Sequence, residues 1–268
     1  MMSKEQLVSI AGGELCITRQ GDPSAPLVVH LEGHRAQLLS VPDAYLNALL
    51  AAGMQVVRVD NRDVGRSFRA VEDYTLADMA EDIHQLIAYL GGPAIITGRS
   101  MGGAIAQLLA LNHPEDVAGL GLFYTFASSE QRIPRAATPA PFSDRQGFID
   151  YELKELPRIV GSRYPMYPDE IRKLAEHMWD RGVSWEGWEH QRRAMEATEP
   201  WADRLPEIAV PTVVVHGSED PIIPPRFGGE LAAGITGAEF HLVEGMGHQQ
   251  PAELSEFFAE LTMGLKGH

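Results

Sequence analysis

The chain has 268 residues, of which 44% are hydrophobic, enough for one large core or two small domains. Asp and Glu (37) outnumber Lys and Arg (22), so the formal net charge is −15, which disfavours phosphate backbones and anionic membrane surfaces as partners. Cys16 is the single cysteine, which excludes an intrachain disulfide. Because the first residues carry no signal-peptide pattern and no window approaches about 18 apolar residues, we expect a cytoplasmic protein.

The first half of the chain alternates between strand and helix patterns. Residues 7–21 predict a hairpin that turns at Gly12 and Gly13. The expected strands that follow cover 25–33, 54–60, 94–98 and 117–125, and the expected helices cover 41–53, 76–92 and 101–114. This alternation is typical of a mostly parallel sheet with helices on both faces.

Residues 127–205 interrupt the alternation, because no buried strand is recognisable there. A Pro-rich connection leads into helical patterns, and all four tryptophans lie in this segment, whereas a disordered linker would be poor in aromatics. We therefore predict a packed helical lid at 127–205, above the strand ends of one α/β core made of 1–126 and 206–268. The Pro-rich connection covers 132–142, the helical patterns cover 145–156, 168–182 and 185–197, and the alternation returns at 211–217, 225–234, 238–245 and 251–265.

Ser100 stands at the centre of Gly98-Arg99-Ser100-Met101-Gly102, a G-x-S-x-G match between a predicted strand and a predicted helix. A nucleophilic serine at this place occupies a strained turn, and side chains two positions away on either side would clash, so glycines are required. The helix N-terminus beside it favours a developing oxyanion. The alternative is a glycine-rich turn without catalysis, since five-residue motifs recur by chance.

A serine hydroxyl needs a base, and His248 is the best candidate among the ten histidines, since it follows the last predicted strand on a Gly-rich loop. The base needs a carboxylate that fixes its tautomer. Asp220 ends the preceding strand and directly precedes Pro221, and Glu219 is its competitor. The order Ser100, Asp220, His248 is that of α/β-hydrolases, and it differs from the orders of trypsin-like and subtilisin-like enzymes.

Four blocks of the sequence resemble those of the α/β-hydrolase fold family: VRVDNRDVGRSFRA, TGRSMGGA, HGSEDPIIPP and GMGHQQP. The resemblance covers nearly the whole chain and implies an eight-stranded, mostly parallel sheet with helices on both faces and a helical cap at the insert. Asp63 replaces the commoner glycine of the first block. This variant, with SMG and GMGH, resembles the aclacinomycin methylesterase group, which removes a methyl ester from anthracycline-type polyketides. We expect Asp60, Arg62 and Asp63 to brace their loop through hydrogen bonds.

Two backbone N–H groups are expected to bind the oxyanion, one of them from Met101, the residue after the serine. Most relatives read His-Gly-x in the loop that supplies the second donor. This chain reads Leu31-Glu32-Gly33, which assigns the donor to Gly33 and puts Glu32 in place of a glycine. Glu32 has three candidate roles: a hydrogen-bond acceptor beneath the site, a partner for a cationic group of the substrate, or a structurally paired glutamate. The candidate substrate-binding residues are Glu32, His34, Trp179 and Trp185, although packing is the commoner role of single aromatics.

The sequence therefore predicts a serine hydrolase that cleaves a carboxylic ester through an acyl-enzyme on Ser100, with a methyl ester of an aromatic polyketide as the candidate substrate. Carbon–carbon bond hydrolysis of ring-fission products, lactone hydrolysis and perhydrolysis use the same triad and stay open, although Gln249 stands where many carbon–carbon hydrolases carry tryptophan. A ligand receptor on the same fold is the non-enzymatic alternative. We expect no metal, no cofactor, no nucleic acid and no membrane partner. The oligomeric state is left open, with a homodimer among the alternatives.

Overall fold

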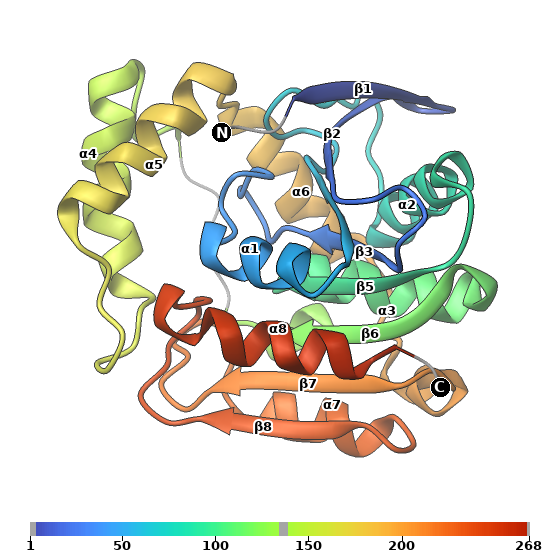
Figure 1. Cartoon of the computed structure of the whole chain (residues 1–268). Helices are drawn as coiled ribbons and strands as arrows, with labels where there is room; N and C mark the ends of the chain where they lie inside the picture. Colours follow the sequence, from blue (N-terminus) through green and yellow to red (C-terminus); the bar gives the residue numbers. More distant parts are fainter. Residues whose placement is uncertain (1–3, 134–138, 267–268) are drawn as a thin grey trace.

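The computed structural model describes residues 4–133 and 139–266, and an eight-stranded sheet runs through it in the order β1-β2-β4-β3-β5-β6-β7-β8 (Figure 1). Strands β1 and β2 form an antiparallel hairpin, β2 also pairs antiparallel with β4, and all other neighbours are parallel. The mostly parallel sheet and the N-terminal hairpin predicted from the sequence are thus confirmed. The strands are β1 (Glu5–Ile10), β2 (Gly13–Gln20), β3 (Leu27–Leu31), β4 (Gln55–Val59), β5 (Ala94–Arg99), β6 (Val117–Phe123), β7 (Thr212–Gly217) and β8 (Glu239–Val243).

Helices cover both faces of the sheet, because the central strands are apolar on both sides. All residues of β4 and β7 are buried, as expected for parallel strands between two helical layers. Helices α1 (Asp43–Ala51) and α8 (Ser255–Gly264) pack on one face, and α2 (Leu76–Leu90), α3 (Met101–Asn112) and α7 (Arg226–Gly234) pack on the other. Short 3-10 helices lie at Pro114–Asp116, Ser129–Gln131, Leu156–Arg158, Ala202–Glu207 and Ala252–Leu254.

The segment between β6 and β7 contains helices α4 (Arg145–Glu155), α5 (Pro168–Arg181) and α6 (Trp185–Ala197), and its described residues form no strand. Figure 1 shows α4 and α5 at the end of the sheet toward which the arrowheads of β7 and β8 point. Ala194 and Met195 of α6 belong to the main hydrophobic core, so this part of the insert packs together with the sheet. The lid limits of 127 and 205 stay a prediction, and residues 134–138 of the Pro-rich connection lie outside the described residues.

The loop after β4 anchors the insert to the sheet. Asp60 accepts hydrogen bonds from the backbone N–H groups of Leu38 (2.8 Å) and Arg66 (3.0 Å), and it forms an ion pair with Arg181 at the end of α5 (2.7 Å). The bracing role predicted for Asp60 is confirmed, and the structure extends it to the lid. Further bonds join Arg62 to Asp82 (2.7 Å) and the Tyr74 hydroxyl to Asp63 (2.7 Å).

None of the helices in residues 4–133 and 139–266 combines the length and the apolar character that crossing a membrane requires.

Two glycines allow β5, α3 and β3 to meet closely. A Cβ atom on Gly98 would lie 2.3 Å from the carbonyl oxygen of Gly102, and one on Gly102 would lie 2.2 Å from the carbonyl oxygen of Leu31. Both distances are far below van der Waals contact, and the opposing atoms belong to the backbone, which cannot turn away as a side chain can. The clash predicted for side chains at these two positions is confirmed.

We expect Gly102→Ala to lower the free energy of unfolding by about 1–3 kcal/mol, because the added methyl group forces α3 away from β3. Gly264→Ala is the matched control, since Gly264 also lies in a helix and a Cβ there would meet nothing within 4 Å. That variant should be unchanged or stabilised by up to about 1 kcal/mol. Urea denaturation measures both, and equal effects of the two substitutions would contradict the close contact.

Candidate active site

Ser100 occupies the turn between β5 and α3 in a conformation that is unusual for a residue with a side chain. Its φ is 52° and its ψ is −122°. Positive φ values are strained for non-glycine residues and persist only where the surroundings enforce them. Here the Ser100 N–H donates to the carbonyl oxygen of Phe123 (3.0 Å), and the Ser100 carbonyl accepts from the hydroxyl of Thr125 (2.6 Å). The backbone is thus fixed on both sides while the side chain lines a cavity.

His248 and Asp220 come from the loops after β8 and β7, and their side chains are in contact. Nδ1 of His248 donates to Oδ2 of Asp220 at 2.7 Å. The competing carboxylate, Glu219, points elsewhere: it accepts from the backbone N–H (2.6 Å) and the hydroxyl (2.7 Å) of Ser162. The structure therefore brings Asp220, and not Glu219, to the histidine.

Asp220 is a buried carboxylate with four donors. Oδ1 accepts from the backbone N–H groups of Ile222 (2.8 Å) and Ile223 (2.9 Å), while Oδ2 faces His248 and also Nε2 of His216 (3.2 Å). Burial alone would raise the pKa of Asp220, but the charge of His248 and the hydrogen bonds outweigh it and hold this pKa well below its usual range. Asp220 is thus a fixed anion that orients the imidazole.

A cavity of about 590 Å³ lies between the strand ends and the lid, and Ser100 and His248 both line it. Because Nδ1 of His248 is held by Asp220, Nε2 is the ring nitrogen left to exchange a proton with a group in the cavity. The Tyr124 ring packs edge-on against the His248 ring, with the centroids 4.9 Å apart, and so limits its rotation. The wall includes the aliphatic and sulfur-containing residues Ala36, Leu39, Val41, Leu156, Ile159, Val160, Met166, Leu174, Met178, Met195, Ile222 and Ala252. It also includes the charged residues Arg35, Asp43, Arg99, Arg132, Glu152, Glu155, Glu170, Lys173 and Glu253.

The two predicted oxyanion donors flank Ser100. A Cβ built on Gly33 would lie 3.2 Å from Cβ and 3.8 Å from Oγ of Ser100, so the Gly33 backbone runs beside the serine side chain. Met101 is the first residue of α3. In the described part of the chain, neither the Gly33 N–H nor the Met101 N–H donates to another protein group, which leaves both available to a ligand.

The structure corrects three of the four candidate substrate contacts. The Glu32 side chain is fully buried and paired with Arg99, so it lies beneath the cavity and not on its wall. Trp179 and Trp185 do not line the cavity either. They pack in the aromatic cluster of the lid, each close to the ring of Phe142 (6.3 and 5.9 Å).

His34 does line the cavity, and its Nε2 is hydrogen-bonded to the carbonyl oxygen of Trp188 in α6 (2.7 Å).

Sequence reasoning missed residues that support the site from behind. His216 shares the carboxylate of Asp220, and its i, i+4 spacing to Asp220 was the available signal. Gln249 uses both ends of its amide on lid backbone: Oε1 accepts from the N–H of Gly161 (2.9 Å), and Nε2 donates to the carbonyl of Tyr164. The residue after the histidine therefore holds the base of the lid to the histidine loop.

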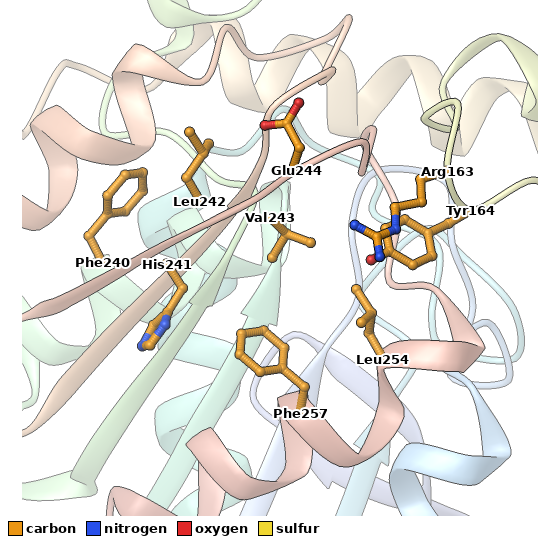
Figure 2. A pocket seen from close by; sticks show the side chains of 9 residues that line it. All are labelled: Arg163, Tyr164, Phe240, His241, Leu242, Val243, Glu244, Leu254 and Phe257. Atoms are coloured by element: carbon orange, nitrogen blue, oxygen red, sulfur yellow. The ribbon is translucent and has the colours of Figure 1, made fainter.

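A second hollow and a histidine cluster lie outside this site. The hollow is walled by β8 and α8, with Arg163 and Tyr164 at one end (Figure 2), and shares no residue with the cavity at Ser100.

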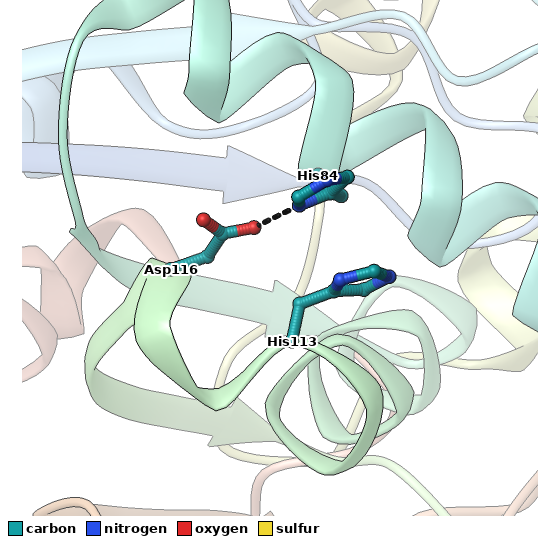
Figure 3. A group of neighbouring side chains, drawn as sticks. All are labelled: His84, His113 and Asp116. Atoms are coloured by element: carbon teal, nitrogen blue, oxygen red, sulfur yellow. Dashed lines mark hydrogen bonds and ion pairs between the residues drawn. The ribbon is translucent and has the colours of Figure 1, made fainter.

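Figure 3 shows the cluster of His84, His113 and Asp116. The two rings are stacked nearly parallel, 3.9 Å apart. Each ring already has a carboxylate partner: His84 contacts Asp116 (2.6 Å) and His113 contacts Glu81 (3.1 Å). These contacts tie α2 to the end of α3.

Known proteins share the family and the fold of this chain. Residues 26–255 match the family described as serine aminopeptidase, S33. The rhodomycin D methylesterase of Streptomyces peucetius is 28% identical, with 88% of this chain and 89% of that protein covered. A putative carbamate hydrolase of Variovorax paradoxus is 28% identical over 76% of this chain and 77% of its own. Among solved structures, the enol-lactonase from Burkholderia xenovorans LB400 shares the fold, with a TM-score of 0.75, 24% identity and coverage of 97% and 99%.

The depressed pKa of Asp220 predicts how stability depends on pH. The unfolded chain has an Asp pKa of about 3.9, above the folded value, so ionised Asp220 stabilises the fold above that pH and loses this effect as the pH falls. Asp220→Asn should therefore be less stable than the native chain at neutral pH, and the difference should shrink below about pH 4. Urea unfolding across this range tests it, and a difference that stays constant into acid would count against the buried anion.

Proposed function

Because the chain belongs to the serine aminopeptidase S33 family, we propose that it is a serine hydrolase of carboxylic esters, with Ser100, His248 and Asp220 as its catalytic triad. The observation that carries this proposal is the 2.7 Å hydrogen bond between His248 and Asp220. His248 lines the same cavity as Ser100, which occupies a strained turn between β5 and α3. Asp220 fixes the tautomer of His248, and the elbow exposes the hydroxyl of Ser100.

The reaction proceeds by two acyl transfers. The Ser100 oxygen attacks the ester carbonyl while its proton passes to Nε2 of His248, and the N–H groups of Gly33 and Met101 hold the oxyanion. The tetrahedral intermediate collapses, His248 returns the proton to the leaving alkoxide, and an alcohol departs from the acyl-enzyme. Water then repeats the sequence, with His248 as the base, and the carboxylic acid leaves.

The cavity and the relatives indicate the substrate class. The relative from Streptomyces peucetius is named a methylesterase, which supports a methyl ester and a small leaving alcohol. A cavity of about 590 Å³ is in the range that encloses a drug-sized molecule, and its wall combines aliphatic with charged and polar side chains. We therefore assign the volume to the acid part of the substrate, a large molecule with both apolar and polar groups, such as an aromatic polyketide that carries a methyl ester.

Ser100→Ala should lower kcat/KM for p-nitrophenyl acetate by about 10⁴-fold or more and abolish the initial burst of p-nitrophenol, because no acyl-enzyme can form. Stopped-flow absorbance measures both quantities. Circular dichroism of the variant serves as the control for folding. A native burst in Ser100→Ala, or equally slow turnover by both proteins, would refute the proposal and favour a ligand receptor.

Substituting the neighbouring residues Asp220 and Glu219 one at a time tests which carboxylate is the acid of the triad. Asp220→Asn should reduce kcat by on the order of 10²–10⁴-fold, because His248 loses the acceptor that sets its tautomer. Glu219→Gln should leave kcat within about twofold, since that side chain contacts Ser162 on the surface. Steady-state kinetics of both variants test this assignment, and the reverse pattern of losses would overturn it.

A further inference from the structure

Glu32 and Arg99, the residues directly before the proposed donor Gly33 and the proposed nucleophile Ser100, form an ion pair. Glu32 precedes Gly33, and Arg99 precedes Ser100. Nε and Nη2 of Arg99 contact Oε2 of Glu32 at 2.6 and 2.5 Å. The Glu32 side chain is 0% exposed, and that of Arg99 is 12% exposed, at the wall of the cavity.

Stability alone does not account for this pair. Removing two charges from water costs free energy that their attraction often fails to recover, so apolar residues of similar size commonly serve as well or better. A buried pair at this place therefore calls for a role in the geometry of the site.

The pairing of β3 with β5 brings Glu32 and Arg99 close together. In the parallel ladder of β3 and β5, Leu31 is opposite Gly98. Glu32 is the first residue after β3, and its side chain pairs with Arg99, the last residue of β5. Gly33 then lies beside Ser100. The ion pair thus joins the ends of the two strands just before the chain reaches the donor and the nucleophile.

The peptide unit between Glu32 and Gly33 is held on the other side as well. Nδ2 of Asn61, from the loop after β4, donates to the Glu32 carbonyl oxygen at 3.0 Å. A peptide group is planar, so fixing this carbonyl also fixes the direction of the Gly33 N–H, which belongs to the same unit. Asn61 orients the plane, and Arg99 anchors the side chain that extends from it.

We propose that Glu32 and Arg99 are positioning residues that, with Asn61, aim the Gly33 N–H at the oxyanion formed on the carbonyl attacked by Ser100. This inference rests on the proposed serine hydrolase function. Oxyanion donors act mainly in the transition state, so a misaligned Gly33 lowers kcat and leaves ground-state binding nearly unchanged.

The test compares two buried ion pairs. Glu32→Gln keeps the shape of the side chain and removes its charge. The matched control is Asp82→Asn, which weakens the pair of Asp82 with Arg62, where both contacts are 2.7 Å and neither residue lines the cavity. With p-nitrophenyl butyrate, Glu32→Gln should lower kcat by about tenfold to hundredfold with KM within about twofold, and Asp82→Asn should change kcat by less than about twofold.

Two further measurements distinguish positioning from a purely structural role. A trifluoromethyl ketone, which forms a tetrahedral adduct with the serine, should bind Glu32→Gln more weakly by the same factor as the loss in kcat. The double variant Glu32→Gln/Arg99→Met removes both buried charges, so its melting temperature should recover toward the native value while its kcat stays low. Recovery of kcat in the double variant, or native kcat in Glu32→Gln, would overturn the inference.

The outcomes also separate this inference from the function on which it rests. Activity that survives in Ser100→Ala refutes the proposed function and the positioning role together. An inactive Ser100→Ala beside a fully active Glu32→Gln refutes only the positioning role.

Discussion

The contact of β3 with the first turn of α3 is the constraint on which the site depends. The backbones of Leu31 and Gly102 approach so closely that a single methyl group on the glycine would overlap the Leu31 carbonyl. This approach places the loop after β3 beside Ser100, so Gly33 and Met101 can present their N–H groups to one point. A packing requirement between an apolar strand and an apolar helix thereby also sets the geometry of the proposed oxyanion hole.

The loop after β3 continues from Gly33 to residues that contact the helices of the insert. His34 bonds to the backbone of Trp188, and Arg35 lies over the Trp188 ring, 4.2 Å from its centroid, while its guanidinium pairs with Glu152 in α4 (3.2 Å). A cation held between an aromatic face and a carboxylate has few alternative positions. Helices α4 and α6 and the proposed donor Gly33 are therefore joined through two consecutive residues, both of which line the cavity.

The sequence predicted the fold well because the fold depends on local signals. Apolar runs, helix-ending glycines and the short motifs that contain Ser100, Asp220 and His248 are each visible within a few residues. The hydrogen bonds that hold the site in place join residues far apart in the chain, such as Asn61 with Glu32 and Gln249 with Gly161. No local sequence pattern predicts these pairs. Trp185 shows the limit of residue type as a guide, since an aromatic side chain suits a substrate pocket and a packed lid equally well.

Three pairs of buried charges in this acidic protein lie at the same end of the sheet. Asp60 with Arg181, Glu32 with Arg99, and Asp220 with His248 all lie where parallel strands end or just beyond. Inside the layers such groups would interrupt the apolar contacts of the strands, whereas at the strand ends backbone N–H groups from the loops are available to satisfy them. Asp60 accepts hydrogen bonds from the backbone N–H groups of Leu38 and Arg66. Asp220 accepts them from the backbone N–H groups of Ile222 and Ile223. The end of the sheet that can accommodate fixed anions at low cost is therefore also the end at which one of them, Asp220, orients His248, the proposed catalytic base.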